Sequence, residues 1–122
     1  MAIRSVVPLH CHLREHGDPS ADQLRRDLRV IDTYEEESHR IRRLEQCTRC
    51  GQLYFYEFYE KVDWVGGNDP QYRTWIPVED EESAKELSRM NLFEILQFPS
   101  IRSDFPSDAQ DPSKPKWVNP AC

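Results

Sequence analysis

The sequence lacks a long hydrophobic run, and this absence excludes the common helical membrane proteins. Only 38% of its 122 residues are hydrophobic, whereas 31% are charged. No apolar stretch approaches the roughly 20 residues that a helix needs to cross a bilayer. The first residues, MAIRSVVPLHCHLREHGD, lack the sustained apolar segment of a signal peptide. We therefore expect a cytoplasmic protein, in a reducing compartment where paired cysteines bind metals or carry redox chemistry more often than they form disulfides.

Positive charge is scarce in the second part of the chain. Residues 1–50 carry nine arginines and nine acidic residues, whereas residues 51–122 carry seven basic and thirteen acidic residues. The whole net charge of −6 therefore lies after residue 50. An acidic surface repels phosphate groups and attracts basic proteins. The charge distribution argues against nucleic-acid binding and favours a basic protein partner.

The pattern of apolar residues predicts a single α+β domain over residues 1–122. β-Branched and aromatic residues predict a small antiparallel sheet built around residues 39–78, with a Cys-x-x-Cys knuckle between two strands. Helix-start signals predict short flanking helices near residues 20–29 and 81–97. Residues 1–18 are expected to form an extended arm. Five of the nine prolines fall between residues 99 and 120, so residues 99–122 are predicted to be an irregular Pro-rich tail.

The segment CTRCG, which begins at Cys47, has the spacing of a metal-binding knuckle. Two intervening residues let the thiolates of Cys47 and Cys50 face one ion, and zinc suits thiolates and normally takes four donors. The chain has only one such pair, so the remaining donors must come from elsewhere. We expect zinc to be bound by Cys47, Cys50, Cys11 and His39, because His39 lies on the strand that enters the knuckle and Cys11 supplies a remote thiolate. The other candidate donors are His10, His12, His16 and Cys122.

Other uses of these residues remain as alternatives. A thioredoxin-like redox centre is disfavoured because a strand, and not a helix, is predicted after the dithiol. No local feature marks a cysteine as an activated nucleophile, so we expect no enzymatic activity, and a small thiol- or metal-dependent enzyme is the third alternative. A zinc-ribbon-like nucleic-acid or transcription-associated module is the second alternative. It is disfavoured because the aromatic strand lacks the basic residues that border nucleic-acid platforms. The acidic positions Glu57, Glu60 and Asp63 are interpreted as solvated.

The acidic residues around the predicted hairpin turn and the second helix are the expected partner-binding site. Carboxylates there would steer a basic protein and exclude wrong partners, and neighbouring aromatic residues would act as anchors. The predicted acidic residues are Asp63, Asp69, Glu79, Asp80, Glu81 and Glu82. The predicted anchors are Trp64, Tyr72 and Trp75. A solvated helix N-terminus that complements the helix dipole is the competing interpretation.

The stretch CTRCGQLYFYEFYEKVDWVGGNDPQYRTWIPV, from Cys47 to Val78, resembles a pattern found in small, poorly characterised bacterial proteins. These proteins combine a CxxCGQ knuckle, an aromatic strand and a GGNDPQY turn. The resemblance covers about a quarter of the chain and implies no established activity. More loosely, the small size and acidity of the chain are similar to those of bacterial immunity proteins, which neutralise a toxin by covering its active site. That resemblance implies a stoichiometric binding protein, such as an immunity protein or an antitoxin.

Overall fold

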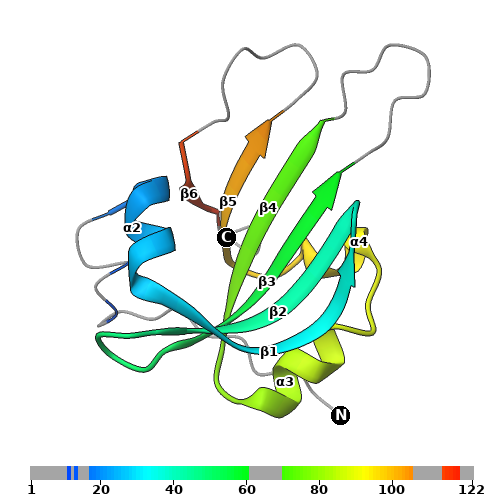
Figure 1. Ribbon diagram of the computed structural model, residues 1–122, viewed down its shortest axis with the longest axis horizontal. Helices are drawn as coiled ribbons and strands as arrows, with labels where there is room; N and C mark the ends of the chain where they lie inside the picture. Colours follow the sequence, from blue (N-terminus) through cyan, green and yellow to red (C-terminus); the bar gives the residue numbers. More distant parts are fainter. Residues whose placement is uncertain (1–10, 12, 14–16, 61–69, 106–113, 119–122) are drawn as a thin grey trace.

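Six antiparallel strands form one sheet, and each strand pairs with its neighbours in sequence (Figure 1). The structure is a computed structural model that describes residues 11, 13, 17–60, 70–105 and 114–118. The strands are β1 (Leu28–Glu37), β2 (Arg40–Cys47), β3 (Leu53–Glu60), β4 (Gln71–Val78), β5 (Ser100–Phe105) and β6 (Lys116–Val118). The helices are α2 (Ala21–Asp27), α3 (Glu81–Leu87) and α4 (Leu92–Ile95). The predicted α+β class and antiparallel sheet are confirmed. Within these described ranges, no helix is long and apolar enough to cross a membrane.

Strand β3 carries aromatic residues on both faces because both faces of the sheet are covered. Tyr54 and Phe55 are adjacent, so they point to opposite faces, and both are fully buried. Tyr54 belongs to a core cluster with Leu24 of α2, whereas Phe55 belongs to a second cluster with Leu87 of α3 and Ile95 of α4. The sheet therefore forms the middle layer, with α2 on one side and α3 and α4 on the other.

The three helices begin at the side chains that the sequence indicates. The hydroxyl of Ser20 accepts a hydrogen bond from the backbone N–H of Gln23 at 3.0 Å, and Asp80 caps α3 in the same way. Asn91 and Glu94 form the predicted capping box, in which each side chain accepts from the other's backbone N–H. Each cap satisfies donors that the first helical turn leaves free. The predicted helices near residues 20–29 and 81–97 are present, the second as two short helices.

A buried ion pair joins the sheet to α3. Arg42 of β2 and Glu57 of β3 are 0% and 1% exposed, and the Arg42 guanidinium lies 2.6 Å from Glu57 Oε2. Its Nη1 also donates to the carbonyls of Leu87, Ser88 and Met90 at 3.3, 2.9 and 2.6 Å. Burial raises the pKa of Glu57, and the charge of Arg42 opposes that shift. The interpretation of Glu57 as a solvated residue is therefore wrong, because it compensates the arginine that holds the end of α3.

The prediction of an irregular tail over residues 99–122 is wrong where the structure describes it. Strands β5 and β6 add to the sheet beyond β4, with Ile101 opposite Trp117. The described prolines of this region precede the strands: Pro99 comes directly before β5, and Pro115 comes directly before β6. Because proline lacks only its own N–H donor, a strand between prolines keeps its ladder of hydrogen bonds.

Candidate metal centre

Cys47 and Cys50 lie on the tight connection between β2 and β3. Cys47 is the last residue of β2, and Cys50 is followed by Gly51 in the left-handed region at φ +82°. The backbone N–H of Gly51 donates to the Cys47 carbonyl at 2.9 Å, which closes the turn. The next residue after Cys47, Thr48, donates its N–H to the carbonyl of Asp27 at 2.8 Å. The end of α2 therefore fixes the turn that presents both thiols.

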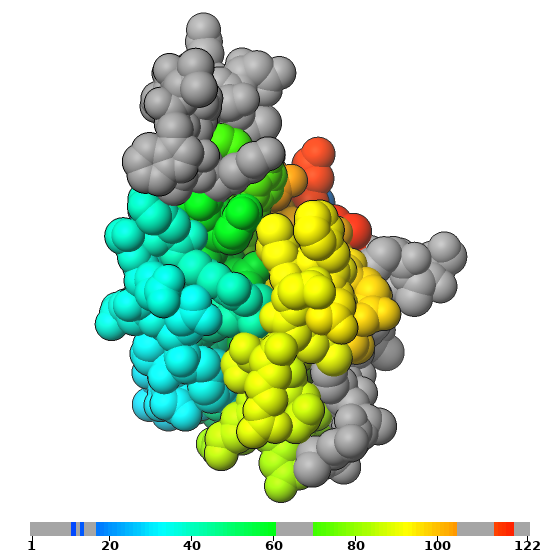
Figure 2. All heavy atoms as spheres, turned by 90° about the vertical axis from the view of Figure 1, so that its right-hand side faces the viewer, coloured from blue at the N-terminus to red at the C-terminus, as the bar shows by residue number. Residues whose placement is uncertain are grey.

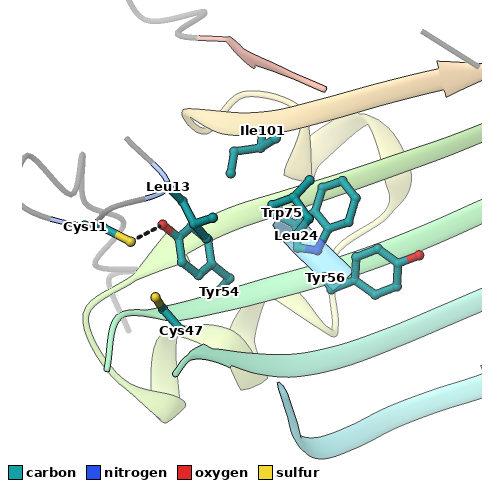
Figure 3. Close-up of a cluster of buried hydrophobic side chains, with 8 residues drawn as sticks. All are labelled: Cys11, Leu13, Leu24, Cys47, Tyr54, Tyr56, Trp75 and Ile101. Atoms are coloured by element: carbon teal, nitrogen blue, oxygen red, sulfur yellow. Dashed lines mark hydrogen bonds between the residues drawn. The ribbon is translucent and has the colours of Figure 1, made fainter. Parts of the chain in front are cut away.

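Cys11 comes from a distant part of the chain and meets this turn. The sulfur atoms of Cys11, Cys47 and Cys50 all lie within 4.8 Å of one another. Cys11 is only 3% exposed, and its sulfur accepts a hydrogen bond of 3.2 Å from the hydroxyl of Tyr54 (Figure 3). The prediction that Cys11 approaches Cys47 and Cys50 is correct for these described residues. Tyr54 was not predicted as part of the site, although it stands on the strand that follows the dithiol.

Burial favours the neutral form of the Cys11 thiol when no cation is bound. Burial raises the pKa of the Cys11 thiol to about 12, and the nearby thiols of Cys50 and Cys47 add to the rise. The hydrogen bond from Tyr54 opposes it. The pKa of Tyr54 is itself raised, first by burial and then by its bond to Cys11. A bound cation would replace the proton of Cys11 and favour its thiolate form.

The arrangement of the three sulfurs fits a thiolate-bound metal. In a tetrahedral site with zinc–sulfur bonds of about 2.3 Å, neighbouring sulfurs are about 3.8 Å apart. The observed limit of 4.8 Å between the three sulfurs is close to that spacing. Three soft donors of one kind favour zinc, copper(I) or an iron–sulfur cluster over magnesium or calcium, which prefer oxygen.

His39 does not join the three cysteines, so its prediction as a zinc ligand is corrected. It precedes β2, whereas Cys47 ends that strand. Eight positions of extended chain separate them by about 25 Å. His39 instead lies beside the end of β3, where its Nδ1 is 2.7 Å from Glu60 Oε1. His39 was predicted as a ligand because it is close in sequence to the strand that enters the turn. The prediction is wrong because the length of that strand separates His39 from the cysteines.

Among the described residues, no fourth histidine, cysteine or carboxylate joins the three cysteines. His10, His12, His16 and Cys122 were the other candidate donors, and none of them is among the residues that the structure describes. Cys11 lies next to two of these histidines in the sequence. A protein donor in the fourth position is typical of a structural zinc site, whereas water there is typical of a catalytic one.

The predicted partner-binding residues that the structure describes do not form one edge. Glu79, Asp80, Glu81 and Glu82 lie at the start of α3, and Asp63, Trp64 and Asp69 lie outside the described residues. Tyr72 is near the beginning of β4, whereas Glu79 follows the end of that strand. Seven positions of extended chain separate the two residues by about 23 Å. Trp75 is 8% exposed and its Nε1 donates to Glu45 at 3.1 Å. The prediction that Tyr72 and Trp75 are anchors beside this acidic segment is therefore wrong.

Phe93 was missed as an exposed aromatic residue near the acidic segment. The first turn of α4 buries Ile95 and leaves Phe93 81% exposed. Helices α3 and α4 lie next to each other on one face of the molecule (Figure 2). The helical spacing of Leu92, Phe93, Ile95 and Leu96 was the available signal, because four apolar residues in five cannot all face the core.

Comparisons of the chain with protein-family models, with curated proteins and with solved structures find no match.

Proposed function

We propose that this chain is a zinc-stabilised binding protein in which Cys11, Cys47 and Cys50 supply three thiolate ligands. The observation that carries the proposal is the convergence of their sulfurs within 4.8 Å. Zinc is the favoured ion because it binds thiolates in tetrahedral sites without redox chemistry. The role is structural, since Cys11 and Cys47 are buried in the core cluster.

The metal would fasten two distant parts of the chain. Cys11 and Cys47 are 36 positions apart in the sequence, and the turn that carries Cys47 is already fixed to the end of α2. A bound ion therefore joins the segment around Cys11 to the sheet and to α2. In such small domains the free energy of metal binding contributes directly to folding.

Metal analysis of protein purified without an affinity tag tests this proposal. We expect about one zinc per chain, loss of that zinc in Cys47→Ser and Cys11→Ser, and a lower melting temperature for both variants and for chelator-treated protein. Thr48→Ser is the matched control, because it changes the same turn and keeps the hydroxyl that donates to the Asp27 carbonyl. Metal-free protein that is fully folded and insensitive to a chelator would refute the structural role.

We further propose that the zinc-stabilised domain binds a basic protein through the surface of α3 and α4, as an immunity protein or an antitoxin does. The specific observation in favour is the exposed ring of Phe93 within an acidic segment: residues 79–94 contain six acidic and two basic residues. Partly exposed aromatic residues often supply most of the binding free energy, while surrounding charges steer association.

Partner capture from an extract of the native cells tests the binding surface. Phe93→Ala and the double variant Glu81→Lys, Glu82→Lys should lose the partner, whereas Glu36→Lys on β1 should retain it. Asp80 is left intact because it caps α3. If the captured partner is a toxin, co-expression should restore growth of cells that make it. Equal capture by all variants would place the interface elsewhere.

A further inference from the structure

A cavity of about 610 Å³ lies between α2 and the face of the sheet that α2 covers. Its floor includes Arg43 and Glu45 of β2, Tyr56 of β3, and Arg73 and Trp75 of β4. Figure 3 shows Tyr56 and Trp75 on the same side of the sheet as Leu24, which lines the cavity from α2. This volume is in the range of small-molecule sites. The three metal-binding cysteines do not line it.

The strand register brings the polar groups of the floor together. Arg43 is opposite Tyr56, and Tyr56 is opposite Trp75, so the three residues form one row across three strands. Arg73 is two positions before Trp75 and therefore faces the same side. Burial raises the pKa of Tyr56, the neighbouring charges of Arg73 and Arg43 oppose that shift, and Glu45 adds to it.

The charge around the cavity is opposite to that of the whole chain. Arg25 of α2 and Lys114, which comes shortly before β6, join Arg43 and Arg73 as lining cations, and Glu45 is the one carboxylate among the described lining residues. The chain as a whole has a net charge of −6. Arg43 is only loosely engaged, with Nη2 3.5 Å from Glu36 at the sheet surface. A concentration of cations in an acidic protein favours an anionic ligand.

The floor also offers a surface for an apolar group. The rings of Tyr56 and Trp75 are 5.0 Å apart at their centroids, and Leu24 packs in the same cluster. The Arg73 guanidinium lies 5.0 Å from the ring centroid of Phe58, which holds its planar fork beside the floor. Guanidinium groups pair well with carboxylate and phosphate oxygens, and aromatic floors pack against planar rings.

We propose that this cavity binds a small organic anion, with its carboxylate or phosphate group at Arg43 and Arg73 and its ring against Tyr56 and Trp75. Glu45 is fixed by the indole N–H of Trp75 and contributes repulsion that the surrounding cations offset. Arg25 pairs with Asp22 on the surface of α2, is 77% exposed on its side chain and acts at the entrance. Inorganic phosphate would engage the cations without using the apolar floor.

Titration of the metal-loaded full chain, followed by the indole N–H signal of Trp75 in a two-dimensional NMR spectrum, tests the proposal. The probes are phenyl phosphate, benzoate, benzyl alcohol and inorganic phosphate. The two aromatic anions should shift the signal in a saturable way, and the stronger of them identifies the headgroup. Benzyl alcohol and inorganic phosphate should bind at least about tenfold more weakly, since each lacks one half of the recognised chemistry.

Variants of the lining cations separate the cavity from general charge effects. Arg43→Gln and Arg73→Gln should each weaken the better aromatic anion by about tenfold or more, because each removes a charge-assisted hydrogen bond. Arg89→Gln on the far side of the sheet is the matched control and should leave binding unchanged. Glu45→Gln should strengthen binding. Arg25→Gln, at an exposed site where folding is safe, should weaken binding about twofold to fivefold through lost charge attraction.

Three results would overturn the proposal. The first is an indole signal that no aromatic anion shifts in the millimolar range. The second is equal loss of binding in Arg89→Gln and in the cavity variants. The third is a thymidine oligonucleotide that binds far more tightly than phenyl phosphate and depends on the same arginines, because that would make the surface a nucleic-acid groove.

Discussion

Replacing Arg42 with methionine should be one of the most damaging single changes in the described structure. The variant keeps a side chain of similar length but removes the positive charge beside buried Glu57 and three hydrogen bonds to carbonyls at the end of α3. Without Arg42, Glu57 can take up a proton and avoid being charged in the core. For a carboxyl with an ordinary pKa of 4.5, this protonation costs about 3.4 kcal/mol at pH 7, and that cost is the upper limit of the electrostatic part of the stability loss. Loss of the carbonyl interactions adds about 1 kcal/mol or more. We therefore expect a loss of about 4–5 kcal/mol, at the upper end for a broken buried ion pair.

Urea unfolding at two pH values measures this loss and tests its cause. In Arg42→Met, Glu57 keeps only the partly exposed Arg40, whose Nε lies 3.7 Å from Oε2, so burial holds the pKa of Glu57 in the folded state above that in the unfolded state. Such a group makes the folded state more stable at low pH, and stability falls as pH rises. The penalty should therefore be about 2.7 kcal/mol smaller at pH 5 than at pH 7, from two pH units at 1.36 kcal/mol each. If the variant is unfolded at pH 7, it should still fold at pH 5.

Two control variants make the Arg42 prediction specific. The double variant Arg42→Met, Glu57→Gln should lose the extra pH dependence, because no carboxyl remains at the pair. Arg89→Met removes an exposed arginine that pairs with Glu86 and should cost less than about 1 kcal/mol. A loss below about 1 kcal/mol in Arg42→Met at pH 7, or a loss that is equal at both pH values, would refute the role assigned to the buried pair.

Three further changes test other described contacts. Asn91→Ala should lower the free energy of unfolding by about 1 kcal/mol in urea because it removes the capping box of α4, and an unchanged value would contradict the cap. The hydroxyl of Tyr34 is buried without a hydrogen-bond partner in the described part of the chain, and burial raises its pKa from 10 to about 12. The melting temperature of the parent protein should therefore fall between pH 10 and 12, because the tyrosine ionises first in the unfolded state. The melting temperature of Tyr34→Phe should fall less over the same pH range. Hydrogen bonds from Gln71 and then His39 lower the pKa of Glu60, so its stabilisation should be present above pH 4.5 and lost as pH falls. Glu60→Gln should reduce that acid sensitivity, and an acid unfolding curve identical to that of the parent protein would exclude the effect.

Local signals in the sequence were sufficient for the helix starts and the central hairpins. Ser20, Asp80 and Asn91 cap the helices that their positions predicted, because an N-cap depends on residues within one turn. The antiparallel pairing of β3 with β4 also follows from neighbouring apolar patterns. Three consecutive glutamates follow Tyr34, and β1 continues through them to Glu37. Glutamates at an edge strand face solvent and do not interrupt backbone pairing.

Contacts between distant residues were predicted only in part. Proximity of Cys11 to the dithiol was expected because a structural metal needs more than two donors, and that requirement is chemical rather than local. The fourth donor was chosen by nearness in sequence, which fails for His39 because an extended strand carries it away from Cys47. The pairing of Arg42 with Glu57 had no sequence signal beyond two opposite charges on neighbouring strands. The cavity between α2 and the sheet depends on the packing of α2 against five strands, β1 to β5, and could not be predicted from the sequence.

The contact between the segment around Leu13 and strand β6 has a consequence for the order of folding during synthesis. Trp117 donates its indole N–H to the carbonyl of Leu13 at 3.0 Å and its backbone N–H to Asp18 at 2.8 Å. The partners are 104 and 99 positions apart, so a ribosome releases residues 13 and 18 long before residue 117. The sheet from β1 to β4 can pair while the chain is still growing, but the segment that carries Cys11 cannot complete its packing until β6 has emerged. The cluster of Cys11, Cys47 and Cys50 would therefore be completed late, after translation has supplied β6.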